Sequence, residues 1–362
     1  MIFQILIAIF SIVILFSLHE LGHFILAKVF GVRVQEFGLG YPPRIFGKTI
    51  GQTFYSLNLL PFGAFVRVYG EEEGVMEGGS FRTKPIWQRA LIVLGGVITF
   101  WIIAFLLFTL VAGVWGLPVA VEDEINHDLK DTKIQIIEIL PNSPAERAEL
   151  KSGDIIKKIE SGGDLLETDK VAEVVEFVKI HQGREVVLTI KRGGEVLEIV
   201  LVPRVSPPEN EGPMGVSLTR TALEHYSWRE APLQGILTTG RVTIAIPRLL
   251  GDALIKSFRG EQPREQIELK GPVGVAQLIG EIIPQGINYF LYFMAIIAIH
   301  AALFNLLPIP AVDGGRLLFL GIEKIKGGPL DPKTEKNVNA FFFTLLIILM
   351  VFVTIKDIKG LL

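Results

Sequence analysis

The sequence contains no cysteine among its 362 residues. Disulfide bonds, thiolate metal ligands and thiol nucleophiles are therefore all excluded. The sequence also lacks a strong excess of either charge, since 35 basic and 38 acidic side chains give a formal net charge of −3. Such a balance gives no reason to expect nucleic-acid binding. No internal repeat is visible, which argues against a metal transporter built from repeated halves.

Apolar residues, in contrast, make up 50% of the chain. A transmembrane helix needs about 20 mostly apolar residues, and four stretches meet or approach that length: residues 2–26, 90–117, 289–307 and 340–354. A cleaved signal peptide is the alternative for the first stretch, but no A-x-A-like cleavage site follows it. We therefore expect an α-helical multi-pass protein of the cell (inner) membrane, with about four spans in the lipid bilayer.

Basic residues indicate how the chain is oriented in the membrane. Lys and Arg concentrate in two connecting segments, residues 28–89 and 316–336. Short loops rich in these residues stay in the cytoplasm. We therefore expect both segments to be cytoplasmic, and residues 118–288 and both termini to be extracytoplasmic.

Two β-type regions interrupt the apolar stretches. TFYSLNLL and GAFVRVY predict a small membrane-associated sheet over residues 45–69. Its edge would allow an extended peptide to pair with it, although a hairpin that merely connects two spans is the alternative. A second β-rich region covers residues 133–204, where IQIIEI and EVVLTI read as strands and KVAEVVEFVK as a helix.

Composition divides the chain into four regions. They are a first membrane half, an inserted extracytoplasmic β-rich domain, a linker with an amphipathic helical segment, and a second membrane half: residues 1–117, 118–205, 206–287 and 288–362. We expect the amphipathic segment to lie on the outer membrane surface, with Trp228 at the interface.

The first apolar stretch carries an unusual group of polar residues, FSLHELGHFIL. A charged side chain at bilayer depth costs about 2.5–3.5 kcal/mol on insertion scales, so such groups are usually functional.

His19, Glu20 and His23 form H-E-x-x-H. Helix positions i and i+4 lie about 40° apart, which lets both imidazoles face one metal ion. This spacing is typical of zinc proteases, with two His ligands and Glu as the general base. Polar contacts between helices are the alternative.

A catalytic zinc site uses three protein ligands and keeps one position open. The third span ends in FNLLPIPAVDGGRLL, where Pro308 and Pro310 interrupt regular helix. Irregular backbone at membrane depth is tolerated where it lines a polar cavity. We therefore predict Asp313 as the third ligand. A helix-capping role is the alternative for Asp313, and His300 is a rival ligand that otherwise would be a hydrogen-bonded interior histidine.

Several of these motifs occur together in one known family. H-E-x-x-H in the first span, N-x-x-P-x-P-x-x-D-G at residues 305–314, and SPAERAELKSGDIIKKIE in the β-rich domain lie in one chain. The last motif resembles a circularly permuted bacterial PDZ domain. Together they resemble the site-2 protease family of intramembrane zinc metalloproteases, of the bacterial sigma-factor-regulating type with a single PDZ domain.

The resemblance implies a role for each matching position. Zinc would be bound by two imidazoles and a carboxylate, water would be activated by a glutamate, and the substrate backbone would be held by an asparagine: His19, His23, Asp313, Glu20 and Asn305. Family members often show G-P-x-x-N-F in the second span, where this chain reads GGVITF. Gly96 and Thr99 thus replace the family's proline and asparagine.

The resemblance also implies the substrates. They would be single-span membrane proteins, such as anti-sigma factors or remnant signal peptides, and the PDZ-like domain would bind peptide termini or act as a size filter. A different function stays open at this point. The chain would then be a membrane adaptor that binds peptide termini through its PDZ-like domain and holds a structural metal. Structural zinc sites usually have four protein ligands, whereas three are recognisable here.

Overall fold

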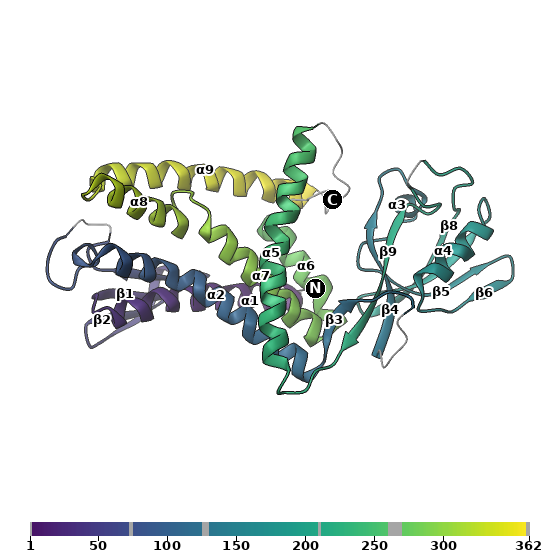
Figure 1. The fold of residues 1–362 in the computed structure, drawn as a ribbon, viewed down its shortest axis with the longest axis horizontal. Coiled ribbons are helices and arrows are strands. Elements are labelled where there is room, and N and C mark those ends of the chain that lie inside the picture. Colours follow the sequence, from purple (N-terminus) through teal and green to yellow (C-terminus); the bar gives the residue numbers. More distant parts are fainter. Residues whose placement is uncertain (1, 72–74, 125–129, 209–210, 260–269, 360–362) are drawn as a thin grey trace. The chain divides into compact units, whose positions relative to one another are not determined.

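The computed structural model describes residues 2–71, 75–124, 130–208, 211–259 and 270–359. They form two compact units, drawn in Figure 1. We call the first the membrane unit; it comprises Met1–Phe108, Pro232–Gly280 and Leu291–Leu362. We call the second the β-rich unit; it comprises Thr109–Ala231 and Glu281–Phe290.

Four of the described helices are long and apolar enough to cross a membrane. They are α1 (Ile2–Val29), α2 (Ile86–Val114), α7 (Ile287–Leu306) and α9 (Pro332–Lys359). The four predicted spans are thus confirmed as helices, and the chain is a multi-pass membrane protein. The last helix is longer than predicted, because polar turns at both ends continue its apolar centre.

Helices α1 and α2 approach each other closely at two glycines. A Cβ atom on Gly22 would lie 2.3 Å from the carbonyl oxygen of Gly95, and one on Gly95 would lie 2.7 Å from the carbonyl oxygen of Gly22. Small residues let helix backbones come this near in a membrane protein. The crossing brings α2 against the part of α1 that carries the H-E-x-x-H motif.

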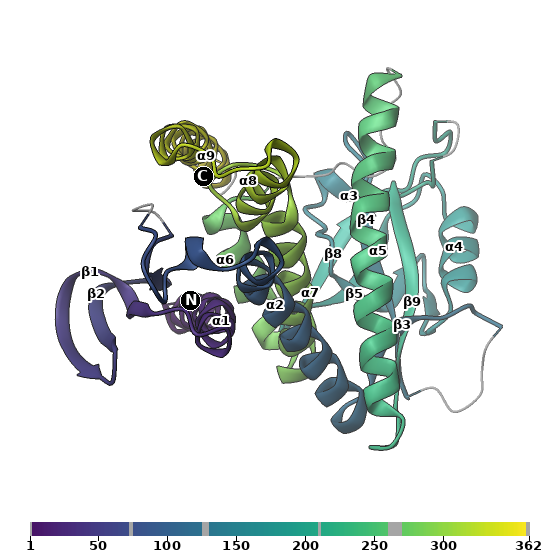
Figure 2. The same ribbon diagram turned by 60° about the vertical axis from the view of Figure 1, so that its left-hand side comes forward.

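The predicted sheet is a two-stranded antiparallel hairpin, β1 (Val34–Ile50) and β2 (Thr53–Val68), that lies beside α1 (Figure 1, Figure 2). It starts at Val34, not at residue 45 as predicted. The pairing register shifts repeatedly along β1, including between Tyr41 and Arg44. Bulges of this kind let a strand continue through glycine and proline positions that break the sequence pattern.

The predicted helix break after α7 is present. Helix α8 (Asp313–Lys326) begins after a non-helical segment that contains both prolines. A Cβ atom on Gly314 would lie 2.0 Å from the carbonyl oxygen of Leu307, and one on Gly315 would lie 2.3 Å from that of Ile309. The chain therefore folds back tightly onto the start of α8, and the two glycines make room for it. Helix α8 then runs beside α9 (Figure 1).

Two further helices belong mainly to the membrane unit. Helix α5 (Ala231–Phe258) is the predicted amphipathic segment, and α6 (Pro272–Ile282) precedes the short 3-10 helix η2 (Ile283–Gln285). The backbone N–H groups of Gly271 and Gly274 donate to Asp357 Oδ2 at 2.9 and 2.8 Å. This carboxylate of α9 thereby satisfies donors at the start of α6. The 3-10 helix η1 (Phe81–Thr83) precedes α2.

The β-rich unit contains a seven-stranded sheet in the order β3-β9-β4-β5-β7-β8, with β6 paired to β5. All its printed pairings are antiparallel. The strands are β3 (Leu117–Ala120), β4 (Lys130–Ile139), β5 (Ile155–Ser161), β6 (Asp164–Leu166), β7 (Val186–Arg192), β8 (Glu195–Leu201) and β9 (Val216–Glu224). Helices α3 (Pro144–Arg147) and α4 (Val171–Ile180) accompany it. Val174 and Val178 of α4 are buried in its core.

The predicted end of this domain at residue 205 is wrong. Strand β9 lies between β3 and β4, and pairs Ala222 with Val119 and Leu218 with Ile136. Residues assigned to a linker therefore form an inner strand of the sheet. The signal was weak because the partners of β9 lie far away in sequence and the linker-like VSPPENEGPMGV precedes it.

Candidate metal centre

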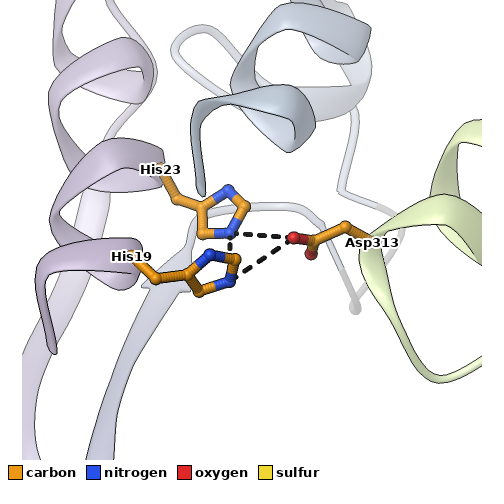
Figure 3. A group of neighbouring side chains, drawn as sticks. All are labelled: His19, His23 and Asp313. Carbon is orange, nitrogen blue, oxygen red and sulfur yellow. Dashed lines mark hydrogen bonds and ion pairs between the residues drawn. The ribbon is translucent and has the colours of Figure 1, made fainter. Parts of the chain in front are cut away.

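Two helices bring three buried side chains together. His19 and His23 extend from α1, one turn apart, toward Asp313 at the start of α8 (Figure 3). Their Nε2 atoms lie 3.2 Å from each other. Each Nε2 atom also lies 3.4 Å from Asp313 Oδ2. All three residues are buried. The structure thus places the three predicted ligands in one cluster.

The surroundings of each imidazole fix its orientation. His23 Nδ1 lies 2.9 Å from the carbonyl oxygen of Ile92 on α2. Since a carbonyl only accepts, Nδ1 carries the proton and the Nε2 lone pair points into the cluster. Metal-binding histidines are commonly oriented by such an outer hydrogen bond. The ring of His19 stacks on Phe100, with centroids 4.5 Å apart and an interplanar angle of 20°.

Gly96 of α2 makes room for both rings. A Cβ atom at this position would lie 2.3 Å from His19 Cε1 and 2.4 Å from His23 Nε2. Sequence reasoning treated Gly96 as a departure from the family pattern and missed this role. The available signal was a Gly-Gly pair inside an apolar helix, which is typical of close helix contacts. Thr99 instead donates to the carbonyl oxygen of Gly95 in its own helix, at 2.9 Å.

Asp313 does not act as the N-cap of α8. The N-cap position is Val312, which has no side-chain capping bond, and Asp313 is the first helical residue. Its Oδ2 atom is buried and has no hydrogen-bond partner among the described residues. A buried acceptor left this way costs about 1–3 kcal/mol, and more when it is charged. A cation between this oxygen and the two Nε2 atoms would remove that cost.

The dimensions of the cluster suit zinc. In a tetrahedral site with bonds of about 2.0–2.1 Å, neighbouring ligand atoms are about 3.3 Å apart. The three distances here, 3.2, 3.4 and 3.4 Å, form nearly such a triangle. Two imidazoles and one carboxylate also form the donor set of several catalytic zinc sites. Within the described parts of the chain, no other group of His, Asp or Glu residues meets the same criteria.

The other predicted residues lie around or away from the cluster. Glu20 is half-buried next to His19 on α1. Asn305 is half-buried near the end of α7 and donates to the carbonyl oxygen of Ala301 at 2.9 Å. The rival ligand His300 is outside the cluster: it is exposed on α7, and its Nδ1 lies 2.9 Å from the carbonyl oxygen of Ile296.

Comparison with known proteins indicates that the chain is a protease. Residues 7–349 match Peptidase family M50. A Clostridium perfringens protein, provisionally named a zinc metalloprotease, is 35% identical over 354 residues that cover 96% of both chains. Zinc metalloprotease RasP of Geobacillus kaustophilus is 28% identical over 94% of each chain. RasP of Oceanobacillus iheyensis is 26% identical over 96% of this chain and 97% of its own. The chain therefore belongs to peptidase family M50, the site-2 protease family, and is a membrane zinc metalloprotease.

Proposed function

We propose that this zinc metalloprotease cuts peptide bonds inside the transmembrane segments of single-span membrane proteins. The observation that carries the proposal is the position of the His19, His23 and Asp313 cluster. Two of its members lie within α1, a helix of membrane-spanning length and composition, and the third follows the break after α7. A substrate that reaches this cluster has to enter the apolar part of the protein.

Each side chain of the cluster has a role in the proposal. His19, His23 and Asp313 hold zinc through Nε2, Nε2 and Oδ2. When bound, zinc supplies a Lewis acid that activates water and polarises the scissile carbonyl. Glu20 accepts the proton of the attacking water and delivers it to the leaving amine nitrogen. Its position directly after His19 in α1 places the carboxylate beside the cluster.

An intact substrate helix hides the bond to be cut. All its amide groups are hydrogen-bonded within the helix, so the segment must unwind before attack. The β1–β2 hairpin beside α1 offers strand edges to which an unwound segment can be added. Asn305, at the end of α7, holds the substrate backbone. Helix-breaking residues in a substrate span should therefore raise the cleavage rate, and a substrate series without that trend would remove the capture step.

The proposal includes the substrates and the orientation of the protein in the membrane. Site-2 proteases act on membrane-protein substrates within the bilayer. We propose anti-sigma factors or remnant signal peptides, already shortened outside the membrane. The metal centre would face the cytoplasmic side of the inner membrane, and the β-rich unit would be an extracytoplasmic PDZ-like domain that binds peptide termini or excludes large substrates.

The adaptor function has less support. A structural zinc site would use four protein ligands, but the cluster contains three. Strand β3 also pairs with β9 over residues 117–120 and 221–224. A peptide that adds to β9 along this length would first have to displace β3.

The test uses the purified full chain in proteoliposomes with a tagged single-span reporter. Mass spectrometry of the products locates the bond that is cut. We expect a cut within the apolar segment of the reporter by the wild type and none by Glu20→Gln. A cut in a soluble flank of the reporter, or equal cutting by both proteins, would contradict the proposal.

A further inference from the structure

The tight packing at the break positions Asp313 relative to the end of α7, but it does not position Asp313 relative to α1. Asp313 is the first residue of α8, and the proline-containing break separates α8 from α7. The other two members of the cluster belong to α1, almost 300 residues earlier in the chain. Contacts of α8 with the first part of the chain therefore help to hold the carboxylate near the imidazoles.

Three arginine–glutamate pairs make such contacts, and they line one small cavity of the membrane unit. The first two are Arg82 Nη2 with Glu335 Oε2 at 2.9 Å, and Arg316 Nη1 with Glu71 Oε1 at 2.7 Å. The third is Arg89 with Glu323. Arg82 and Glu71 precede α2, whereas Arg89 belongs to α2 itself. The first pair leads to α9, and the other two lead to α8.

The Arg89–Glu323 pair is the most buried and the best aligned of the three. The Arg89 side chain is 7% exposed and that of Glu323 is 15% exposed. Nη1 donates to Oε2 at 2.9 Å and Nη2 to Oε1 at 2.5 Å. This two-bond geometry fixes both the distance and the angle between the groups that carry it.

Helix α2 therefore contacts both helices that carry the metal-centre residues, α1 and α8. Arg89 lies seven residues before Gly96, so two helical turns place them on the same face of α2. Gly96 supports the imidazole rings, while Arg89 holds α8. Leu317 of α8 adds an apolar contact to the core that contains Ile92 and Val93 of α2.

We propose that Arg89 and Glu323 are positioning residues of the metal centre. Their pair fixes α8 on α2 and so keeps Asp313 Oδ2 within 3.4 Å of both Nε2 atoms. The proposal rests on the ligand set given above. Changing a group that hydrogen-bonds directly to a metal ligand typically weakens metal affinity about 10–100-fold. This pair acts on Asp313 through α8, so its loss should weaken zinc binding about tenfold, at the low end of that range.

The experiment measures the zinc dissociation constant of the purified full-length protein by competition with a chromogenic chelator. The unfolding temperature of the metal-free form is recorded for every variant. Glu323→Gln keeps the shape of the side chain but removes its charge. Removing only one partner of a buried pair leaves a charge without compensation. The double variant Arg89→Met with Glu323→Leu removes both charges and should fold even where a single variant does not.

We expect about tenfold weaker zinc binding in Glu323→Gln and in the apolar double variant. The swapped pair, Arg89→Glu with Glu323→Arg, should recover most of the affinity. The matched control is Arg192→Met, which breaks another two-bond pair, with Asp154 in the β-rich unit, where both distances are 2.7 Å. This control should keep wild-type zinc affinity.

Three results would overturn the proposal. The first is wild-type zinc affinity in the apolar double variant, and the second is an equal loss of affinity in Arg192→Met. The third is wild-type affinity in Asp313→Ala, measured in the same series. That last result would show that the ligand assignment itself had failed, whereas a loss in Asp313→Ala without a loss in the double variant would contradict the positioning role alone.

Discussion

Changing Gly96 to alanine adds a single methyl group and should disable the metal centre. The new Cβ atom would lie 2.3 Å from His19 Cε1, 2.4 Å from His23 Nε2 and 2.5 Å from His19 Nδ1. An ordinary contact begins at 3.4 Å, so the rings or the helices have to move by about 1 Å. The imidazoles have little room to move, because His23 is bonded to Ile92 and His19 is stacked on Phe100.

The expected loss is large. A displacement of about 1 Å at a reacting centre can cost about 10²-fold in rate, and displaced ligands also bind the metal less tightly. We expect Gly96→Ala to lose zinc affinity at least about tenfold and reporter cleavage about 10²-fold in kcat/KM. Zinc is measured by chelator competition, and cleavage with the single-span reporter.

The matched control is Gly321→Ala in α8. A Cβ atom at Gly321 would meet nothing within 4 Å, and alanine in a helix is favoured over glycine by about 0.5–1 kcal/mol. This variant should keep zinc and activity and be slightly more stable. Wild-type zinc affinity and cleavage in Gly96→Ala would refute the reasoning, because they would show that the rings do not depend on the space above Gly96.

Three other predictions test separate parts of the structure. Gly22→Ala should lower the free energy of unfolding by about 1–3 kcal/mol, because its Cβ atom would lie 2.3 Å from the carbonyl oxygen of Gly95; an unchanged denaturation midpoint would contradict the close helix crossing. Removal of zinc by a chelator should lower the unfolding temperature, and zinc at 100 times its dissociation constant should restore about 2.7 kcal/mol; no shift on adding zinc would contradict binding to the folded state. The hydrogen bond from Arg220 holds the pKa of Asp169 below its ordinary value of 3.8. Because the pKa of Asp169 is lower in the folded state than in the unfolded state, this stabilisation is present above about pH 3.8 and is lost as the pH falls further. Acid unfolding of the full chain should therefore depend less on pH in Asp169→Asn than in the wild type. Identical unfolding curves would contradict a stabilising bond between Arg220 and Asp169.

The parts of the structure that the sequence could predict have local causes. The four apolar helices follow from length and composition. The meeting of His19 and His23 follows from helical periodicity alone, and their spacing also suggested a metal. Asp313 could be predicted as a member of the cluster because Pro308 and Pro310 interrupt the helix just before it. Irregular backbone at membrane depth is tolerated where it lines a polar cavity.

The parts that were missed depend on residues far apart in the chain. Gly96 reads as an ordinary helix glycine until α1 is packed against it. The pair of Arg89 and Glu323 joins positions 234 residues apart, and no pattern in either segment predicts it. The sequence did not predict strand β9 for the same reason, because its neighbours β3 and β4 come about a hundred residues earlier.

The most direct test of the account separates metal binding from proton transfer in one pair of proteins. Zinc content per chain and cleavage of the single-span reporter are measured for the wild type and for Glu20→Gln. Because Glu20 is proposed as the base and not as a ligand, both proteins should hold one zinc ion per chain, and only the wild type should cut within the span. A Glu20→Gln protein that loses its zinc, or one that keeps cutting, would contradict the central claim.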